Sequence, residues 1–225
     1  MPESWPPGPA RPVLAGGAVH VWRADLDVDS RLGGLLCAEE QARAARLVAA
    51  RHRQRWTHSR EVLRALLGLY LDADPAGLRF SLSVHGKPSL DPPAIFFNLS
   101  HSGGVALYAI SSSEEVGVDV ELERGGATDV MAIAVRTFDP QEVAHLQALG
   151  ERERAGAFLQ AWVRHEAELK RLGTGLLRSD VQTADRAADP WIGDLDVGPD
   201  AAAAVALEHP PSELCCWAWR PADSG

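Results

Sequence analysis

Two short stretches of the chain carry side chains that suit a site for a divalent cation and a phosphate. The first has the sequence Gly-Val-Asp-Val-Glu at residues 117–121. Because side chains alternate between the two faces of a β-strand, a strand here presents Asp119 and Glu121 on one face and directs Val120 into the core. Carboxylate oxygens are ligands that Mg²⁺ prefers. The alternative is an exposed strand edge on which both charges are simply solvated.

The second stretch, residues 162–176, has the spacing of a helix. It places Glu166 and Lys170 one turn apart, with Trp162 one turn earlier. A third carboxylate beside a lysine would complete a cation and phosphate site with the acidic strand. The alternative for Glu166 and Lys170 is a surface ion pair, which stabilises a helix by only about 0.2–0.5 kcal/mol. For Trp162 we expect a packing role that anchors the helix.

Lysine is rare in this chain. Of the 22 lysine and arginine residues, only Lys87 and Lys170 are lysine. The compact charge of lysine and the planar fork of arginine are not interchangeable at a tight site, so both lysines are candidate phosphate ligands. Lys87 lies in a Gly-Lys-Pro sequence, and the alternative to a binding role is that this sequence is an ordinary turn.

A third polar motif, Asn-Leu-Ser-His-Ser, occupies residues 98–102. It follows an apolar run at 95–99 that predicts a strand. Ser100 and His101 should therefore lie at the end of this strand, where a hydroxyl and an imidazole can contact a phosphate. The alternative is a histidine with a purely structural role.

Composition excludes several classes of protein. The net charge of −9 argues against a general nucleic-acid binder. The three cysteines lack metal-ligand spacing, and the adjacent Cys215 and Cys216 suit a disulfide poorly, which predicts reduced thiols in a cytoplasmic protein. The first residues lack the features of a signal peptide, and the sequence holds no apolar run long enough to span a bilayer, so we expect no membrane partner.

Periodicity predicts an α+β fold of two similar lobes, each with helices packed on a small antiparallel sheet. The lobes are expected at 16–122 and 123–225, after a flexible proline-rich tail at 1–15 and with a polar break at 123–126. Strands are predicted at 18–26, 79–84, 95–99, 105–111, 116–122, 191–197, 203–208 and 214–219, and helices at 38–50, 53–71, 129–137, 140–149 and 152–172.

Taken together and in this order, the three motifs resemble those of the 4′-phosphopantetheinyl transferases of the surfactin-synthetase-activating type. Gly-Lys-Pro with Asn-Leu-Ser-His-Ser resembles the first family motif, Gly-Val-Asp-Val-Glu the second, and the helical stretch the third. Each motif alone is a weak signal, but all three in order are specific. The resemblance covers residues 38–220 and implies that the two lobes are related by a pseudo-two-fold axis.

The resemblance implies transfer of the 4′-phosphopantetheine arm of coenzyme A to a serine of an acyl or peptidyl carrier protein, with release of 3′,5′-ADP. It implies Mg²⁺, or Mn²⁺ in its place, held by Asp119, Glu121 and Glu166. It also implies that the N-terminal lobe binds the nucleotide of coenzyme A and that the C-terminal lobe carries the catalytic helix and the carrier-docking surface. Two complete-looking lobes in one chain favour a monomer. Glu166, Lys170 and His165 are the implied catalytic residues.

The same resemblance places Lys87, Ser100, His101 and Lys170 on coenzyme A. Seven arginines between residues 43 and 64 form a basic stretch on the early helices, and the alternative for each is a solvated helical face. We predict Arg43 and Arg55 as contacts of the 3′-phosphate. For carrier docking, the apolar candidates are Met131, Phe138 and Leu146, whose alternative is core packing.

One position departs from the family pattern. Residue 165, just before the catalytic glutamate, is histidine where the family usually has lysine. A histidine changes its charge near neutral pH, so His165 is either a part-time positive charge beside Glu166 or a proton relay. This departure also keeps open a non-catalytic module that binds coenzyme A and carrier proteins. A coenzyme A-dependent acyltransferase is a third reading, but it needs a splayed strand pair or a Cys/His pair, and neither is recognisable.

Overall fold

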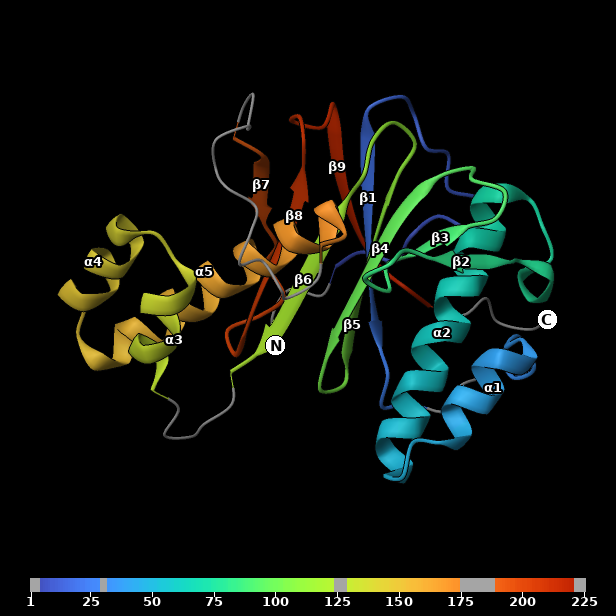
Figure 1. The fold of residues 1–225 in the computed structure, drawn as a ribbon. Coiled ribbons are helices and arrows are strands. Elements are labelled where there is room, and N and C mark those ends of the chain that lie inside the picture. Colours follow the sequence, from blue (N-terminus) through green and yellow to red (C-terminus); the bar gives the residue numbers. More distant parts are fainter. Residues whose placement is uncertain (1–4, 29–31, 124–128, 175–188, 221–225) are drawn as a thin grey trace.

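The computed structural model describes residues 5–28, 32–123, 129–174 and 189–220, and it is an α+β fold (Figure 1). The helices are α1 (Ala38–Ala45), α2 (Ala50–Leu71), the short 3-10 helix η1 (Pro75–Gly77), α3 (Val130–Thr137), α4 (Pro140–Ala148) and α5 (Glu151–Leu172). The strands are β1 (Ala18–Asp25), β2 (Phe80–Leu82), β3 (Pro88–Leu90), β4 (Phe96–Ser102), β5 (Val105–Ser111), β6 (Gly117–Leu122), β7 (Trp191–Asp194), β8 (Ala201–Leu207) and β9 (Glu213–Ala218).

These strands form two main sheets and one hairpin. The first sheet has the order β4-β5-β1-β9, the second has the order β6-β8-β7, and β2 pairs with β3. The prediction of purely antiparallel sheets is wrong for the first one, because β9 runs parallel to β1. A parallel neighbour needs a long crossover connection, which the second half of the chain supplies. Two pairings join strands from the two parts of the chain, because β6 pairs with β8 and β1 pairs with β9.

The first sheet is buried on both faces. Along β1, Val19 and Val21 belong to a core shared with the second sheet, whereas Trp22 and Ala24 belong to a core shared with α2. This alternation follows from the period of two of a strand, and contact on both faces explains why β1 is buried along almost its whole length. The α3 and α4 helices lie beside α5, on the opposite side of the molecule from α1 and α2 (Figure 1).

Helix α5 packs on the second sheet at close range. Val163 and Ala167 of the helix lie in one buried cluster with Ala202, Ala204 and Ala206 of β8. Gly117 explains the short separation: a Cβ atom there would lie 1.9 Å from the carbonyl oxygen of Ala167 and 2.4 Å from the backbone nitrogen of Arg171. Glycine at this position therefore lets α5 rest directly on β6, which fixes the height of its side chains above the acidic strand.

The described part of the expected N-terminal tail is packed onto the body of the protein. Trp5 is 8% exposed, and its indole nitrogen donates to the carbonyl oxygen of Asp196 at 2.6 Å. Gly8 donates its backbone N–H to Ala218, and Ala218 donates to Pro6, so this segment borders β9. The large apolar surface of the tryptophan accounts for the burial, which the abundance of proline concealed.

Among the described helices, none combines the length and apolarity needed to cross a bilayer.

Candidate active site

Strands β4 and β6 face each other through their side chains. Ser100 donates its hydroxyl to Oδ1 of Asp119 at 2.7 Å, and Ser102 donates to Oε2 of Glu121 at 2.7 Å. Next to them, Oδ1 of Asn98 accepts the backbone N–H of Val118 at 3.0 Å. Alternate residues of the first motif, at 98, 100 and 102, therefore bind the second motif at 118, 119 and 121, and the edges of the two sheets meet along the acidic strand.

Ser100 and His101 lie within β4 and do not follow its end, which corrects the predicted strand boundary at residue 99. The strand continues to Ser102 because it stays paired with β5 over that length. Partial desolvation and, next, the charge of Lys170 hold the pKa of His101 below its usual value. An imidazole in such cationic surroundings would gain its proton more readily when an anion binds nearby.

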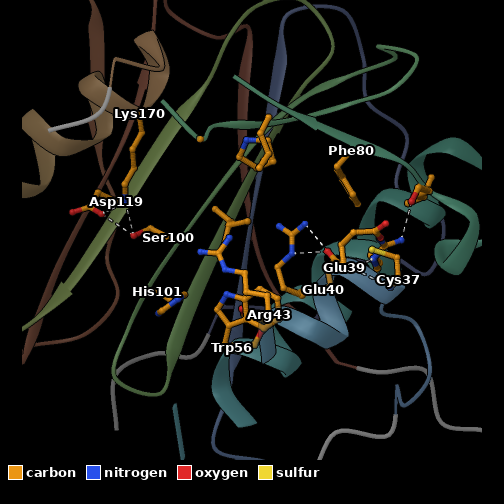
Figure 2. Close-up of a pocket in the computed structure, with 18 of the residues that line it drawn as sticks. Cys37, Glu39, Glu40, Arg43, Trp56, Phe80, Ser100, His101, Asp119 and Lys170 are labelled. Atoms are coloured by element: carbon orange, nitrogen blue, oxygen red, sulfur yellow. Dashed lines mark hydrogen bonds and ion pairs between the residues drawn. The ribbon is translucent and has the colours of Figure 1, made fainter. Parts of the chain in front are cut away.

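The third motif joins the first two at one point (Figure 2). The ammonium group of Lys170 donates to Oγ of Ser100 at 2.8 Å and to Oδ1 of Asp119 at 2.5 Å. Glu166 lies one helical turn before it, on the same face of α5. One residue from each motif, at positions 100, 119 and 170, therefore forms a closed hydrogen-bonded triangle.

Two carboxylate oxygens at this junction suit a divalent cation. Oδ2 of Asp119 and Oε1 of Glu166 are buried and have no hydrogen-bond partner among the described residues. Burial, followed by the neighbouring charges of Asp119 and Glu121, raises the pKa of Glu166 although Lys170 opposes the shift. Buried polar atoms are normally paired, so two unpaired oxygens in mutually repelling carboxylates fit the donor set of an oxygen-seeking ion such as Mg²⁺.

The junction lies in the wall of a cavity of about 1060 Å³, a volume that suits a ligand the size of a coenzyme. The cavity extends from α5 and β6 to α1, α2 and the β2–β3 hairpin, and its far part is rich in arginine. Of the predicted site residues, it is lined by Arg43, Ser100, His101, Asp119, Glu121, Glu166 and Lys170.

Two of the predicted coenzyme A ligands have other partners. Arg55 forms a bidentate ion pair with Asp27, with N–O distances of 2.7 and 2.6 Å, and it does not line the large cavity. The ammonium group of Lys87 contacts the carboxylate of Glu115 and donates to the backbone carbonyl of Arg171 at 2.9 Å. Lys87 thereby ties the hairpin to the end of α5, and it lines a smaller cavity of about 410 Å³ that also reaches Glu166.

His165 lies outside both cavities. Its ring is edge-on to Phe138, with 6.0 Å between centroids, and 6.4 Å from the ring of Trp162. Trp162 packs with the α3–α4 cluster as expected and also lines the large cavity. Of the carrier-docking candidates, Leu146 is fully buried, so the prediction that it is exposed is wrong: it fills the core between α3, α4 and α5.

Sequence reasoning missed a group of residues at the far end of the cavity. Glu40, Arg60, Arg64 and Phe80 line it together. The spacing of Arg60 and Arg64 places them on one face of α2, which was an available signal, but nothing local indicates that Glu40 of another helix pairs with both. This pairing is a tertiary contact.

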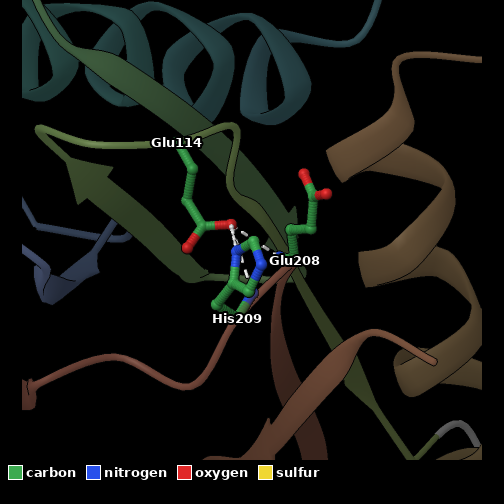
Figure 3. Close-up of side chains that lie close together, drawn as sticks. All are labelled: Glu114, Glu208 and His209. Atoms are coloured by element: carbon green, nitrogen blue, oxygen red, sulfur yellow. Dashed lines mark hydrogen bonds and ion pairs between the residues drawn. The ribbon is translucent and has the colours of Figure 1, made fainter. Parts of the chain in front are cut away.

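A second cluster of potential metal ligands lies elsewhere (Figure 3). The ligand atoms of Glu114, Glu208 and His209 lie within 4.8 Å of one another. Oε2 of Glu114 accepts the backbone N–H groups of Glu208 and His209 at 2.8 and 3.2 Å. These bonds give the carboxylate a structural role, since it holds the segment that follows β8.

Comparison with known proteins agrees with this geometry. Residues 115–208, which include β6 and α5, match the family model described as the 4′-phosphopantetheinyl transferase superfamily. The chain is 35% identical over 186 residues to the 4′-phosphopantetheinyl transferase HetI of Nostoc sp., covering 79% of this chain and 78% of that protein. The chain belongs to the 4′-phosphopantetheinyl transferase superfamily.

Other members of the superfamily are similar over a large part of their length. A 4′-phosphopantetheinyl transferase of Bacillus subtilis is 33% identical over 154 residues, which covers 63% of this chain and 67% of that one. A phosphopantetheinyl transferase of Thraustochytrium sp. is 27% identical over 202 residues, covering 83% of this chain and 70% of that one. Within the superfamily match lie the acidic strand and the helix that carries Glu166 and Lys170.

Proposed function

We propose that this transferase moves the 4′-phosphopantetheine arm of coenzyme A onto a serine hydroxyl of an acyl or peptidyl carrier protein, as holo-acyl-carrier-protein synthases do, and releases 3′,5′-ADP. The observation that carries the proposal is the meeting of three motifs at one cavity wall. There, the unpaired oxygens of Asp119 and Glu166 lie beside the ammonium group of Lys170. The arginine-rich remainder of the cavity suits the nucleotide phosphates of coenzyme A.

In this reaction an oxygen–phosphorus bond forms between the carrier serine and the β-phosphorus, and the bond from that phosphorus to 3′,5′-ADP breaks. Such a transfer depends mainly on positioning and on neutralising phosphate charge. Asp119, Glu166 and Glu121 would hold Mg²⁺, or Mn²⁺, which supplies charge neutralisation at the pyrophosphate. Lys170, already oriented by Ser100 and Asp119, would add a point charge at the same place.

Glu166 is also our candidate acceptor of the serine proton, directly or through water. Its raised pKa makes the carboxylate a stronger base than an exposed glutamate. We propose that His165, the preceding residue of α5, supports it with a positive charge that is present only while the imidazole is protonated. Arg43, His101 and Ser100 would contact coenzyme A from the cavity wall, whereas Arg55 and Lys87 would have to leave their present partners to do so.

The remaining features of the proposal concern organisation. Two pseudo-symmetric lobes, divided near residue 122, would bind the nucleotide on the N-terminal side and the carrier on the C-terminal side. The enzyme would act as a cytoplasmic monomer. The rival function is a module that binds coenzyme A and carriers without catalysis, but the complete set of Asp119, Glu166 and Lys170 favours catalysis.

Intact-mass measurement of an apo-carrier tests the function directly. The carrier is incubated with the protein, coenzyme A and Mg²⁺, and it should gain about 340 Da, the mass of the arm. The gain should disappear with a chelator and return when excess Mg²⁺ is added. Binding of coenzyme A with no mass gain on any of several acyl and peptidyl apo-carriers would favour the non-catalytic module, and gain of an acyl group alone would indicate an acyltransferase.

A further inference from the structure

The arginine-rich part of the cavity contains a buried carboxylate (Figure 2). Glu40 of α1 is 9% exposed. Its Oε1 accepts from Nε and Nη2 of Arg60 at 2.9 and 2.7 Å, and its Oε2 accepts from Nε of Arg64 at 2.7 Å. Burial alone would raise the pKa of Glu40, but the two arginines outweigh burial and lower it. The cavity proposed to bind an anion therefore keeps a negative charge in its wall.

The bonds of Glu40 connect three walls of the cavity. Its Oε2 also accepts the backbone N–H of Cys37, which starts α1, at 3.2 Å. Arg64 is 1% exposed and extends this hydrogen-bond network, because its Nη1 donates to the carbonyl oxygens of Pro75 and Leu78, both at 3.0 Å. One carboxylate therefore joins α1, α2 and the segment that leads into β2.

The guanidinium groups of Arg60 and Arg64 also contact the β2–β3 hairpin, through Phe80. The Cζ atoms of Arg60 and Arg64 lie 5.1 and 5.0 Å from the centre of the Phe80 ring. Cation–π contacts of this kind depend on how the guanidinium group lies over the ring, which the bonds to Glu40 fix. The position of β2 in the cavity wall thus depends on a residue of α1.

Helix α1 needs such an anchor. It has 8 residues, too few for an isolated helix to be stable, so its position depends on its tertiary contacts. Arg43 of α1 lines the cavity and stacks its guanidinium over the ring of Trp56 of α2 at 5.4 Å. Because Glu40 lies one turn before Arg43, its two ion pairs set where Arg43 points.

We propose that Glu40 is a positioning residue for coenzyme A: its ion pairs with Arg60 and Arg64 hold α1, α2 and the hairpin so that the cavity cations face the nucleotide phosphates. This inference rests on the proposed function. The inference predicts the direction in which the affinity for coenzyme A changes. A carboxylate with no positioning role in an anion site would weaken binding by repulsion, so its neutralisation would tighten binding. A positioning carboxylate gives the opposite result.

The test compares Glu40→Gln, which removes the charge, with Glu40→Asp, which keeps the charge and shortens the side chain. Both should raise the KM for coenzyme A and its calorimetric Kd roughly tenfold or more, the effect of losing one charge-assisted hydrogen bond. The kcat and the KM for the carrier should stay within about twofold. The control is Asp194→Asn, which removes a carboxylate paired with Arg164 outside the cavity and should leave coenzyme A binding unchanged.

Tighter binding in Glu40→Gln, or unchanged binding in both variants beside a lowered Tm, would overturn the proposal. If both variants fail to fold, Arg60→Lys decides in their place, because it disrupts the bonds to Oε1 and leaves the buried Arg64 pair intact; unchanged binding there would also overturn the inference. If the wild-type protein binds coenzyme A but transfers nothing, the proposed function fails, and the calorimetric comparison still tests Glu40.

Discussion

Glu166→Gln should stabilise the fold and abolish most of the activity. Oε1 of Glu166 is buried without a partner among the described residues, and burial together with the charge of Asp119 raises its pKa. An ionised carboxylate in this place costs folding free energy and is retained for its chemistry. Glutamine keeps the size and shape of the side chain and removes the charge.

The size of the effect follows from these contacts. A buried polar group without a partner costs about 1–3 kcal/mol. Glutamine still buries a polar amide, so only part of the cost is recovered, about 1 kcal/mol. In a domain of this length, that change corresponds to a rise of about 2–4 °C in Tm. Transfer should fall at least about 100-fold, the scale of losing one electrostatic contact to a transition state.

The stability gain should depend on pH. Because the folded state raises the pKa of Glu166, it binds this proton more tightly than the unfolded state does. The cost of ionisation is therefore absent below the unfolded pKa of about 4.3 and grows as the pH rises from there to the folded pKa. The Tm advantage of Glu166→Gln should be largest near neutral pH and should vanish near pH 4.

Thermal unfolding in chelator-containing buffer measures this advantage, with Glu123→Gln, an exposed glutamate just after β6, as the control. With Mg²⁺ and coenzyme A the order should reverse, since the wild-type protein gains more stability from ligand binding. A variant that is less stable than the wild-type protein at neutral pH, or that keeps transfer within a few-fold, would refute the reasoning.

Three further predictions concern other parts of the site. Arg43→Ala should lower the preference for coenzyme A over its dephospho form, measured by calorimetry, more than Arg55→Ala does, because only Arg43 lines the cavity; the reverse order would reassign the 3′-phosphate contact. Transfer should weaken as the pH rises through the near-neutral range in which histidine side chains lose their charge, and His165→Lys should flatten the profile; superimposed profiles of the two proteins would mean that His165 only packs against Phe138 and Trp162. Gly117→Ala should destabilise the fold by about 1–3 kcal/mol and lower kcat by displacing α5. Gly156→Ala, on the open face of α5, should do neither. Equal effects of the two substitutions in unfolding and kinetic assays would contradict the close packing of α5 on β6.

Local periodicity predicted most elements of the fold. The alternation of Asp119, Val120 and Glu121 gave β6 and its acidic face, and the apolar spacing after residue 150 gave α5 with Glu166 and Lys170 one turn apart. Val120 is fully buried, as the alternation requires. These features depend on neighbours within a turn or a strand, which is the range that a sequence pattern reports.

Contacts between separate segments of the chain could not be predicted from the sequence. The parallel pairing of β9 with β1 joins residues almost 200 positions apart, and no local signal specifies it. The bonds from Ser100 to Asp119 and from Glu40 to Arg60 likewise depend on which edges and helices meet. The family motifs indicated that the site exists, but they did not indicate that Glu40 connects its far wall.

Single-turnover transfer to one apo-carrier tests the central claim most directly, because it compares the two clusters of carboxylates in one assay. Asp119→Asn removes the carboxylate that binds Lys170 and Ser100, whereas Glu114→Gln changes the cluster with Glu208 and His209. Our account predicts a loss of at least about 100-fold in the first and a change within about twofold in the second. Full transfer by Asp119→Asn, or loss confined to Glu114→Gln, would contradict it.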